Sequence, residues 1–405
     1  MSKYGLLGEH LGHSYSPQIH KILGGYDYQL FERAPEELKD FLLSGDFDGI
    51  NVTIPYKKAV IPYCSELSPA AERIGSVNTI IRRADGTLFG DNTDYYGFCE
   101  LARKTGAEIS GKAVILGNGG VSPTVRAALE AMGAEEVITV SRKGEDNYDN
   151  LDRHYDAKVI VNATPVGMFP NNGQTLVELE RFTECICVLD VIYNPLRTKL
   201  VLDAEALGIK AAGGLYMLVA QAARACELFI GKKIDEAQID AVYNKLSTDM
   251  QNIVLIGMPG CGKSTGGYQL QKKTGRELID IDKEIVARAG MSIPEYFEKF
   301  GVDGFRKLET EVVCDIGKLS GQIIATGGGV ITREENYNLL HQNGIIIFLE
   351  RDIENLPTNG RPLSQANPLS KLAEERLPLY NKWCDYKIKG ESPYDAAEKI
   401  LEALK

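Results

Sequence analysis

The chain contains no apolar stretch long enough to cross a membrane. Its 405 residues include no run of about 18 consecutive apolar residues, so no membrane-spanning helix is predicted. The first residues, MSKYGLLGEHLGHS, have neither a long apolar core nor a cleavage pattern, which argues against a secretory signal. The formal net charge is -11, so no electrostatic attraction to nucleic acid or to an anionic membrane is expected. We therefore expect a cytoplasmic protein that acts on small molecules.

Cysteine clusters of the kind that bind zinc are also missing. The eight cysteines are scattered, and the one close pair is Cys185 and Cys187. This pair is too closely spaced for the usual zinc site, and it lies in an apolar, strand-like run. The pattern favours buried thiols in a reducing compartment over metal ligands or disulfides.

Internal repeats and low-complexity tracts are absent as well, and the length suits two or three domains. Short apolar strands alternate with helices, for example at 113–117, 124–134, 136–141 and 158–164. This alternation predicts an α/β fold with a parallel, doubly wound sheet. A polar helix is expected at 234–252, and a new strand starts at Ile253, so we place a domain boundary near Asp249.

Residues 253–265, IVLIGMPGCGKST, join an apolar strand to a P-loop. In such a loop, backbone N–H groups and a helix N-terminus point at phosphate oxygens. Lys263 would reach the β- and γ-phosphates, and the Ser264 hydroxyl would bind Mg²⁺. A guanine-binding N-K-x-D motif is not found, because residues 381–385 have one residue too many, so the P-loop does not indicate a GTPase.

Further motifs follow the P-loop in a fixed order. They are Asp280-x-Asp282, Phe305-Arg306-x-x-Glu309, Gly327-Gly328-Gly329, Arg361-Pro362-Leu363 and Glu375-Arg376-x-Pro378. Each taken alone has an ordinary explanation, such as a helix N-cap or a solvated charge. Together they resemble shikimate kinase over essentially all of residues 251–405. The resemblance implies a nucleoside-monophosphate-kinase-like domain with a five-stranded parallel sheet and a lid.

The resemblance also implies a role for each kinase residue. ATP would be bound by Gly257, Gly260, Gly262, Lys263, Ser264 and Thr265, and Mg²⁺ by Ser264 and Asp280. Shikimate would contact Asp282, Arg306, Gly327, Gly328, Gly329 and Arg376. Asp282, Lys263 and a lid residue, Arg361, would act in catalysis. Glu354 stands where the family often has an arginine that covers adenine, so the adenine must be held in another way, for example by backbone and apolar contacts.

A second nucleotide motif, Gly117-x-Gly119-Gly120, follows the strand at 113–116. It is a weak dinucleotide signal by itself, because the usual fingerprint has Gly or Ala where Ser122 stands. The next strand ends in Ser141-Arg142-Lys143, where an NAD site usually has an acidic residue. The cations favour a 2′-phosphate and hence NADP(H), although they could also be solvated charges on a turn.

Polar motifs at the ends of strands surround this region. They include Ser14-x-Ser16, Thr53-Ile-Pro-x-Lys57, Asn78-Thr79, Asn92-Thr93-Asp94, Asn162-Ala-Thr164-Pro-x-Gly-Met168, Tyr193-x-Pro195 and Gln221. Turns and caps would explain any one of them, but the ordered set resembles shikimate dehydrogenase over about residues 3–246. The resemblance implies that Lys57 and Asp94 form the catalytic pair. It implies substrate contacts for Ser14, Ser16, Thr53, Asn78, Tyr193 and Gln221, and NADP contacts for Gly117, Gly119, Gly120, Ser141, Arg142, Thr164 and Met168.

The two resemblances point to consecutive reactions. We predict a fusion that reduces 3-dehydroshikimate with NADPH and then phosphorylates shikimate with ATP and Mg²⁺. Its predicted domains are a substrate-binding domain at 1–100 completed by helices at 214–248, a Rossmann-like NADP domain at 101–213, and a kinase domain at 251–405. A quinate/shikimate dehydrogenase of broader specificity and a metabolite-binding regulator with an inactive site remain alternatives, and the oligomeric state is left open.

Overall fold

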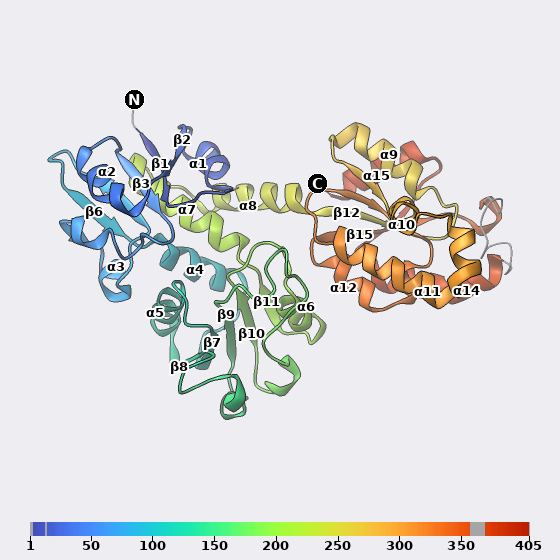
Figure 1. Ribbon diagram of the computed structural model, residues 1–405, viewed down its shortest axis with the longest axis horizontal. Helices are drawn as coiled ribbons and strands as arrows, with labels where there is room; N and C mark the ends of the chain where they lie inside the picture. The colour runs from blue at the N-terminus through green and yellow to red at the C-terminus, as the bar shows by residue number, and fades with distance from the viewer. Residues whose placement is uncertain (1–2, 13, 357–368, 405) are drawn as a thin grey trace. The chain divides into compact units, whose positions relative to one another are not determined.

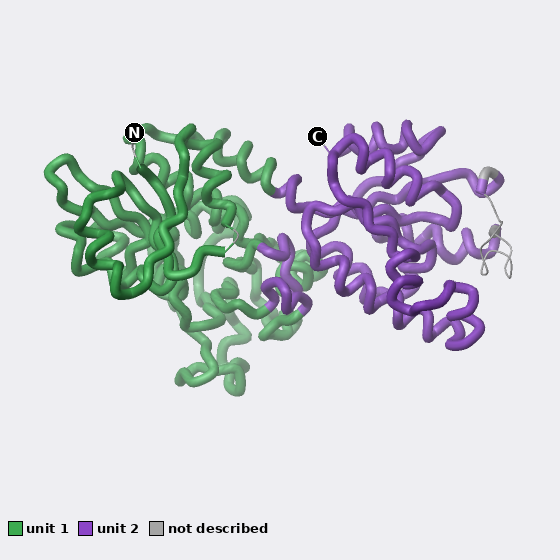
Figure 2. Tube along the Cα trace, turned by 45° about the horizontal axis from the view of Figure 1, so that its top comes forward, with its two compact units in different colours: residues 1–166, 174–193, 200–246 green, residues 167–173, 194–199, 247–405 purple. Residues whose placement is uncertain are grey.

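The computed structural model describes residues 3–12, 14–356 and 369–404. The chain divides into two compact units, coloured separately in Figure 2. Unit 1 comprises residues 1–166, 174–193 and 200–246, and unit 2 comprises 167–173, 194–199 and 247–405. The main division along the sequence falls inside helix α8 (Glu236–Met250). One residue, Gln251, separates this helix from the next strand. Among the described residues, no helix is both long enough and apolar enough to span a membrane.

Unit 1 begins with a six-stranded mixed sheet in the order β2-β1-β3-β5-β6-β4. Strands β1, β2 and β3 run parallel, whereas β5 runs antiparallel to β3 and β6. The strands are Tyr4–Gly8, Tyr28–Glu32, Gly49–Val52, Glu66–Leu67, Thr79–Arg82 and Leu88–Asp91 for β1 to β6. Helices α1 (Ser16–Gly24), α2 (Leu38–Ser44) and α3 (Pro69–Ile74) and short 3₁₀ turns at Pro35–Glu37 and Ile61–Tyr63 connect them.

The second sheet of unit 1 has five parallel strands in the order β11-β10-β9-β7-β8. They are β7 (Gly111–Leu116), β8 (Ala134–Val140), β9 (Val159–Asn162), β10 (Cys187–Asp190) and β11 (Lys210–Ala212). Helices α5 (Ser122–Met132) and α6 (Lys199–Ala206) and 3₁₀ segments at Tyr148–His154 and Leu179–Arg181 complete the crossovers. The chain passes from β7 to β8 on one side and then to β9 on the other. Parallel sheets bind ligands at the carboxyl ends of the strands where the chain reverses in this way, here the ends of β7 and β9.

Two helices link the sheets of unit 1. Helices α4 (Thr93–Lys104) and α7 (Leu215–Ile230) pack closely against each other (Figure 1). A Cβ at Gly97 would lie 2.6 Å from the carbonyl oxygen of Met217, so only glycine allows this approach. The contact brings the first turn of α4 next to the middle of α7, and both contribute to the site described below.

Unit 2 contains a five-stranded parallel sheet in the order β13-β14-β12-β15-β16, which confirms the predicted sheet. Its strands are β12 (Asn252–Ile256), β13 (Leu278–Asp280), β14 (Ile323–Ala325), β15 (Gly344–Glu350) and β16 (Tyr386–Lys389). Its helices are α9 (Lys263–Thr274), α10 (Ile281–Ala289), α11 (Ile293–Ile316, kinked at Gly301), α12 (Glu335–His341), α14 (Leu369–Trp383) and α15 (Pro393–Ala403), with 3₁₀ turns at Val330–Thr332 and Ile353–Asn355. Apolar side chains of β12, β14 and β15 form the core between these helices.

All eight cysteines are free thiols in the structure. Cys185 and Cys187 are buried, and burial raises the pKa of Cys185 to about 11. Such a thiol stays protonated at neutral pH and packs as a small apolar side chain.

Candidate active sites

A cavity of about 300 Å³ opens in unit 1 between the mixed sheet and helices α4 and α7. It brings together side chains that lie far apart in the sequence. All the residues predicted to contact substrate or to act as the dehydrogenase pair line it, namely Ser14, Ser16, Thr53, Lys57, Asn78, Asp94, Tyr193 and Gln221. Apolar residues, among them Leu6, Val52, Val121, Val191, Met217 and Leu218, complete the wall.

Lys57 and Asp94 form an ion pair in this cavity. The Lys57 ammonium lies 2.6 Å from Asp94 Oδ2, and the two side chains are 30% and 15% exposed. Lys57 comes just after β3, and Asp94 lies in the first turn of α4, where Asn92 caps the helix by accepting a hydrogen bond from the Tyr95 amide. A partly buried, charge-assisted contact of this kind holds the ammonium in one place.

A buried network of amides and hydroxyls fixes Asn78. Its Oδ1 accepts hydrogen bonds from the Thr93 amide at 2.6 Å and the Thr79 hydroxyl at 3.1 Å, and its Nδ2 donates to Thr93 Oγ1 at 3.1 Å. Asn51 Nδ2 donates to Thr79 Oγ1 at 2.9 Å, and the Thr93 hydroxyl lies 3.4 Å from Gln221 Oε1. The sequence predictions did not include Asn51, Thr79 or Thr93, whose side chains set the orientation of the predicted contacts.

The opposite wall carries the serines and a tyrosine. The Ser16 amide donates to Ser14 Oγ at 3.2 Å at the start of α1. Tyr193 packs edge-on against Tyr15 with ring centroids 6.1 Å apart, and burial raises the pKa of the Tyr193 phenol. The hydroxyl of Tyr193 therefore stays protonated and available as a donor.

The predicted dinucleotide turn follows β7 directly and approaches the segment after β9. Gly117 has a φ of 101°, and a Cβ there would lie 2.4 Å from Thr164 Cγ2, so the site requires glycine. Thr164 is held by its amide and hydroxyl, which donate to Asn162 Oδ1 at 3.0 and 2.7 Å. A cradle this close to the backbone of two adjacent strands fits the pyrophosphate of a dinucleotide.

The remaining predicted cofactor residues differ in burial and in the unit to which they belong. Ser141 is buried at the end of β8, and Arg142 after it is exposed with no hydrogen bond or ion pair to a described residue. Met168 is exposed and belongs to segment 167–173 of unit 2. The contact between Arg142 and a 2′-phosphate stays a prediction.

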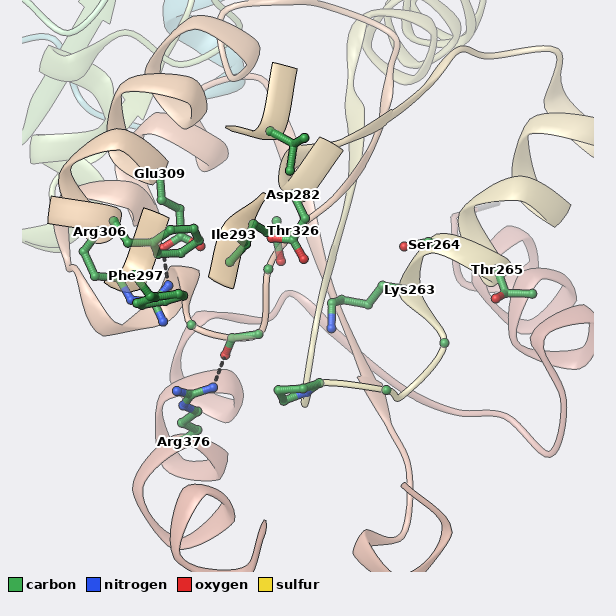
Figure 3. Close-up of a pocket in the computed structure, with 18 of the residues that line it drawn as sticks. Lys263, Ser264, Thr265, Asp282, Ile293, Phe297, Arg306, Glu309, Thr326 and Arg376 are labelled. Carbon is green, nitrogen blue, oxygen red and sulfur yellow. Dashed lines mark hydrogen bonds and ion pairs between the residues drawn. The ribbon is translucent and has the colours of Figure 1, made fainter. Parts of the chain in front are cut away.

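A second cavity, of about 720 Å³, lies at the carboxyl edge of the sheet in unit 2. Figure 3 shows Lys263 between Ser264 and Thr265 on one side and Asp282, Arg306 and Glu309 on the other. The predicted residues that line it are Gly260, Gly262, Lys263, Ser264, Thr265, Asp282, Arg306, Gly327, Gly328, Gly329 and Arg376. Gly257 and Asp280 lie next to the cavity without lining it, and Arg361 lies outside the described residues.

The side chain of Lys263 forms hydrogen bonds within the P-loop, whereas that of Ser264 bonds to the end of β13. The Lys263 ammonium donates to the carbonyl oxygens of Gly257 at 2.8 Å and Met258 at 3.0 Å. The Ser264 hydroxyl donates to Asp280 Oδ2 at 2.6 Å, while Asp280 Oδ1 caps α10 through the Asp282 amide at 3.1 Å. Asp280 is therefore both a helix cap and the carboxylate beside the P-loop serine.

The Ser264–Asp280 pair suits Mg²⁺. In the described part of the chain, no group of three or more His, Cys, Asp or Glu side chains could hold a metal ion. Mg²⁺ at phosphate sites needs few protein ligands, because water and phosphate oxygens complete its octahedron. A hydroxyl and a carboxylate oxygen 2.6 Å apart at the P-loop match that requirement.

Two arginines converge on the triple glycine. Arg306 pairs with the fully buried Glu309 at 2.5 Å, and Arg376 donates to the Gly328 carbonyl at 3.0 Å. A Cβ at Gly329 would lie 1.9 Å from Arg306 Nη2, and one at Gly327 would lie 2.8 Å from Asp282 Oδ1. A side chain at either position would displace the end of Arg306 or Asp282, so glycine lets both side chains lie against the backbone.

Glu309 belongs to a motif that the sequence displayed, but no role was predicted for it. Burial raises the pKa of this carboxyl, and Arg306 opposes the rise. Its spacing of three residues from Arg306 on one helix is the signal that could have identified the pair. Thr326, Arg351 and Pro393 also line the cavity and were not predicted.

Comparison with known proteins identifies the larger part of the chain. Residues 6–80 match the family model for the shikimate dehydrogenase substrate binding domain. A shikimate dehydrogenase (NADP(+)) from Clostridium perfringens strain SM101 is 34% identical over 268 residues, which cover 61% of this chain and 98% of that protein. The chain belongs to the shikimate dehydrogenase family. A shikimate dehydrogenase (NADP(+)) from Methanopyrus kandleri is 38% identical and is covered to 95%.

Solved structures of the family agree with this assignment. A chorismate mutase/shikimate 5-dehydrogenase fusion from Clostridium acetobutylicum is 39% identical with a TM-score of 0.58, covering 60% of this chain and 96% of that one. The shikimate 5-dehydrogenase of Thermus thermophilus, solved with NADP(H) and shikimate, is 32% identical with a TM-score of 0.55. The match covers 60% of this chain and 99% of that one.

The rest of the chain belongs to a different enzyme class. Residues 259–405 match the family model for shikimate kinase. The chain is therefore a bifunctional shikimate-pathway enzyme with a dehydrogenase part followed by a kinase domain, as the two motif sets predicted.

Proposed function

We propose that the enzyme reduces 3-dehydroshikimate to shikimate with NADPH and then transfers the γ-phosphoryl group of ATP to shikimate, giving shikimate 3-phosphate. The observation that carries the proposal is the gathering of both sets of predicted substrate-binding residues into separate cavities, one in each unit. The product of the first reaction is the acceptor of the second.

In the dehydrogenase cavity, Lys57 and Asp94 perform the proton transfer. NADPH supplies the hydride when it is bound. The ketone oxygen becomes an alkoxide as it is reduced, and the Lys57 ammonium, 2.6 Å from Asp94, stabilises this charge and donates a proton. Asp94 holds the ammonium and contacts the adjacent hydroxyl, while Asn78, Thr53 and Gln221 bind ring hydroxyls, and Ser14 and Ser16 bind the carboxylate.

The preference for NADP(H) rests on Arg142. An acidic side chain at the end of β8 would repel a 2′-phosphate, whereas the exposed guanidinium attracts it. The related proteins that are named shikimate dehydrogenase (NADP(+)) support this choice. The glycine turn at 117–120 and Thr164 would hold the pyrophosphate.

In the kinase cavity, catalysis depends on position and charge. Arg306 and Arg376 bind the shikimate carboxylate, and Asp282 orients the hydroxyl that attacks. Lys263 exchanges its two loop carbonyls for phosphate oxygens. Ser264 and Asp280 would hold Mg²⁺, which neutralises charge on the phosphates when it is bound, and Arg361 is proposed to act from the lid.

The test uses the full chain and its two candidate substrates. NADPH absorbance should fall on addition of 3-dehydroshikimate, and mass spectrometry should detect shikimate 3-phosphate once ATP and Mg²⁺ are added. A chain that consumes NADPH and ATP with these substrates supports the proposal. A chain that binds both substrates without turnover would be the metabolite-binding regulator.

Quinate is the competing substrate of the dehydrogenase. A quinate dehydrogenase from Corynebacterium glutamicum, solved with NAD, is 28% identical and superimposes with a TM-score of 0.56. We expect NADP-dependent oxidation of shikimate to exceed that of quinate in the same assay. Equal kcat/KM values for shikimate and quinate would favour the broader enzyme.

A further inference from the structure

Unit 1 contains a further cavity, of about 500 Å³, that the proposed reactions do not use. Helices α3, α4, α5 and α7 all contribute residues to its wall. None of the described residues that line it also lines the dehydrogenase cavity. Its volume falls in the size range of small-molecule sites, so its lining indicates what kind of molecule it fits.

Two arginines bring positive charge into this cavity from different helices. Arg73 lies on α3 and Arg224 on α7, and both line the cavity. Each donates one hydrogen bond to a glutamate that does not line it, Arg73 to Glu130 at 2.8 Å and Arg224 to Glu227 at 2.9 Å. Because a guanidinium has five N–H donors, both arginines keep donors for a carboxylate in the cavity.

A carboxylate in the same cavity carries the opposite charge. Asp91, at the end of β6, is only 8% exposed. Its Oδ1 accepts hydrogen bonds from the Ser68 hydroxyl and from the Asn92 amide, the latter at 2.7 Å. No Lys, Arg or His side chain in the described part of the chain pairs with it. Because a buried anion is costly without a cation, Asp91 favours a ligand with a positive charge.

The remaining wall gives the ligand an apolar surface. It is formed by small or apolar side chains and by two tyrosine rings, namely Pro69, Ala70, Ile74, Ala127, Tyr95 and Tyr96. Burial raises the pKa of both phenols, so their hydroxyls stay protonated at neutral pH and can donate hydrogen bonds. A ligand that fills this cavity therefore needs an apolar body in addition to its charged groups.

We propose that this cavity binds an α-amino acid whose side chain carries an aromatic ring. The α-carboxylate accepts hydrogen bonds from Arg73 and Arg224, the α-ammonium donates to Asp91, and the ring packs against the apolar side chains and the tyrosines. A simple carboxylate would leave Asp91 without a cation, and a simple amine would leave both arginines without an anion. An amino acid supplies both charges from one carbon atom.

The charge requirement is tested on the full-length wild type by isothermal titration with three related molecules. L-phenylalanine carries both charges, 3-phenylpropanoate lacks the ammonium, and 2-phenylethylamine lacks the carboxylate. The second and third should bind roughly tenfold more weakly than L-phenylalanine, because each loses a charge-assisted contact. Equal affinity for L-phenylalanine and 3-phenylpropanoate, or no binding of L-phenylalanine, would overturn the proposal. This series needs no variant, so it stands even if a substitution prevents folding.

Substitutions then locate the binding in this cavity. Asp91→Asn should weaken L-phenylalanine on the order of tenfold but 3-phenylpropanoate less than about twofold, because only the amino acid loses a charge partner. The double variant Arg73→Ala/Arg224→Ala should weaken both ligands by roughly tenfold or more. Unchanged affinity for L-phenylalanine in either variant would place the amino acid elsewhere and contradict the assignment.

A matched control is Arg83→Ala/Arg181→Ala. These two arginines of unit 1 also pair with glutamates, at 2.7 and 2.6 Å, but neither lines the cavity. The control should leave L-phenylalanine affinity unchanged, and an equal loss in the control would refute the specific role of Arg73 and Arg224. Saturating shikimate should not displace L-phenylalanine, since the described linings of the two cavities of unit 1 do not overlap. Displacement by shikimate would assign the amino acid to a substrate site and defeat the proposal.

Discussion

The two sites hold their central lysines in opposite ways. Lys57 of the dehydrogenase cavity donates to a carboxylate, Asp94, at 2.6 Å. Lys263 of the kinase cavity donates to two neutral carbonyls of its own loop, at 2.8 and 3.0 Å. A lysine that must donate a proton to a substrate benefits from an anion that positions it. A lysine that must bind phosphate needs partners that a phosphate can displace, and a neutral carbonyl is weaker than a carboxylate.

The sites also differ in how they fix their polar residues. In the dehydrogenase cavity, neutral amides and hydroxyls orient one another, with Asn78 bonded to Thr79 and Thr93. In the kinase cavity, a buried charge pair, Arg306 and Glu309, performs this task. Breaking a buried ion pair leaves an uncompensated charge, so the kinase site should be the more sensitive to loss of one partner.

The largest expected effect is on the dehydrogenase lysine. Lys57→Met should lower the rate of 3-dehydroshikimate reduction by about 10²-fold or more, because Lys57 is the one lysine among the described residues that line this cavity. Stopped-flow or steady-state absorbance of NADPH measures this, with Lys58→Met, the exposed neighbouring residue that does not line the cavity, as the control. Kinase activity should not change. A Lys57→Met enzyme with a normal rate would remove Lys57 from the mechanism.

The next largest effects are expected in the kinase cavity, where one residue orients the attacking hydroxyl and another binds the substrate carboxylate. Asp282→Asn should lower kcat on the order of 10²-fold while ATP still binds, because the attacking hydroxyl loses its orienting carboxylate. Arg376→Ala should chiefly raise the KM for shikimate, by roughly tenfold or more, since a charge-assisted contact is lost. Coupled ADP-release assays give both constants. An Asp282→Asn variant with normal kcat would contradict the assignment.

A smaller effect is expected for the cofactor. Arg142→Ala should weaken NADPH binding on the order of tenfold and leave NADH binding nearly unchanged, because only NADPH carries the 2′-phosphate. Fluorescence titration with both cofactors measures the ratio, and NADH serves as the internal control. Preference of the wild type for NADH would show that the charges after β8 are merely solvated.

The variant with the smallest expected effect on activity tests a pH dependence of the stability of unit 1. Burial lowers the pKa of His20 to about 3, and its ring stacks on Tyr28 at 4.1 Å. Because the folded pKa lies below the unfolded value, the stabilisation is complete above about pH 6.5 and is lost as the pH falls toward 3, with a slope of up to about 1.4 kcal/mol per pH unit. Urea unfolding of wild type and His20→Gln at pH 7 and 5 should show a shallower pH dependence in the variant. Equal dependence in both would exclude His20 as the cause.

The sequence predicted the strands and helices with the strongest patterns and missed those without one. The apolar runs that became β7 and β12 were identified, whereas β4 and β11, with two and three residues, carry too little pattern to be seen. Helix α4 starts at Thr93 because Asn92 provides the cap, a start that apolar periodicity does not mark. The cap matters for function, since it places Asp94 in the first turn.

The residues of the two sites also divide into those that the sequence predicted and those that it missed. Residues in ordered motifs, such as Lys57 and Asp282, could be selected because the motif sets resemble known families, and both residues line the two cavities. Arg351 could not, because its position depends on which strand lies beside β12, and strand order is not written in local sequence. The assigned roles remain predictions until the variants are measured.

The most direct test of two independent sites acting in sequence uses the single-site variants together. With 3-dehydroshikimate, NADPH, ATP and Mg²⁺, Lys57→Met should form no shikimate 3-phosphate yet should phosphorylate added shikimate normally. Asp282→Asn should accumulate shikimate, and a mixture of the two variants should restore formation of shikimate 3-phosphate, followed by mass spectrometry. If the mixture stays inactive while each variant retains its own remaining activity, or if Asp282→Asn yields shikimate 3-phosphate at the wild-type rate, the account is contradicted.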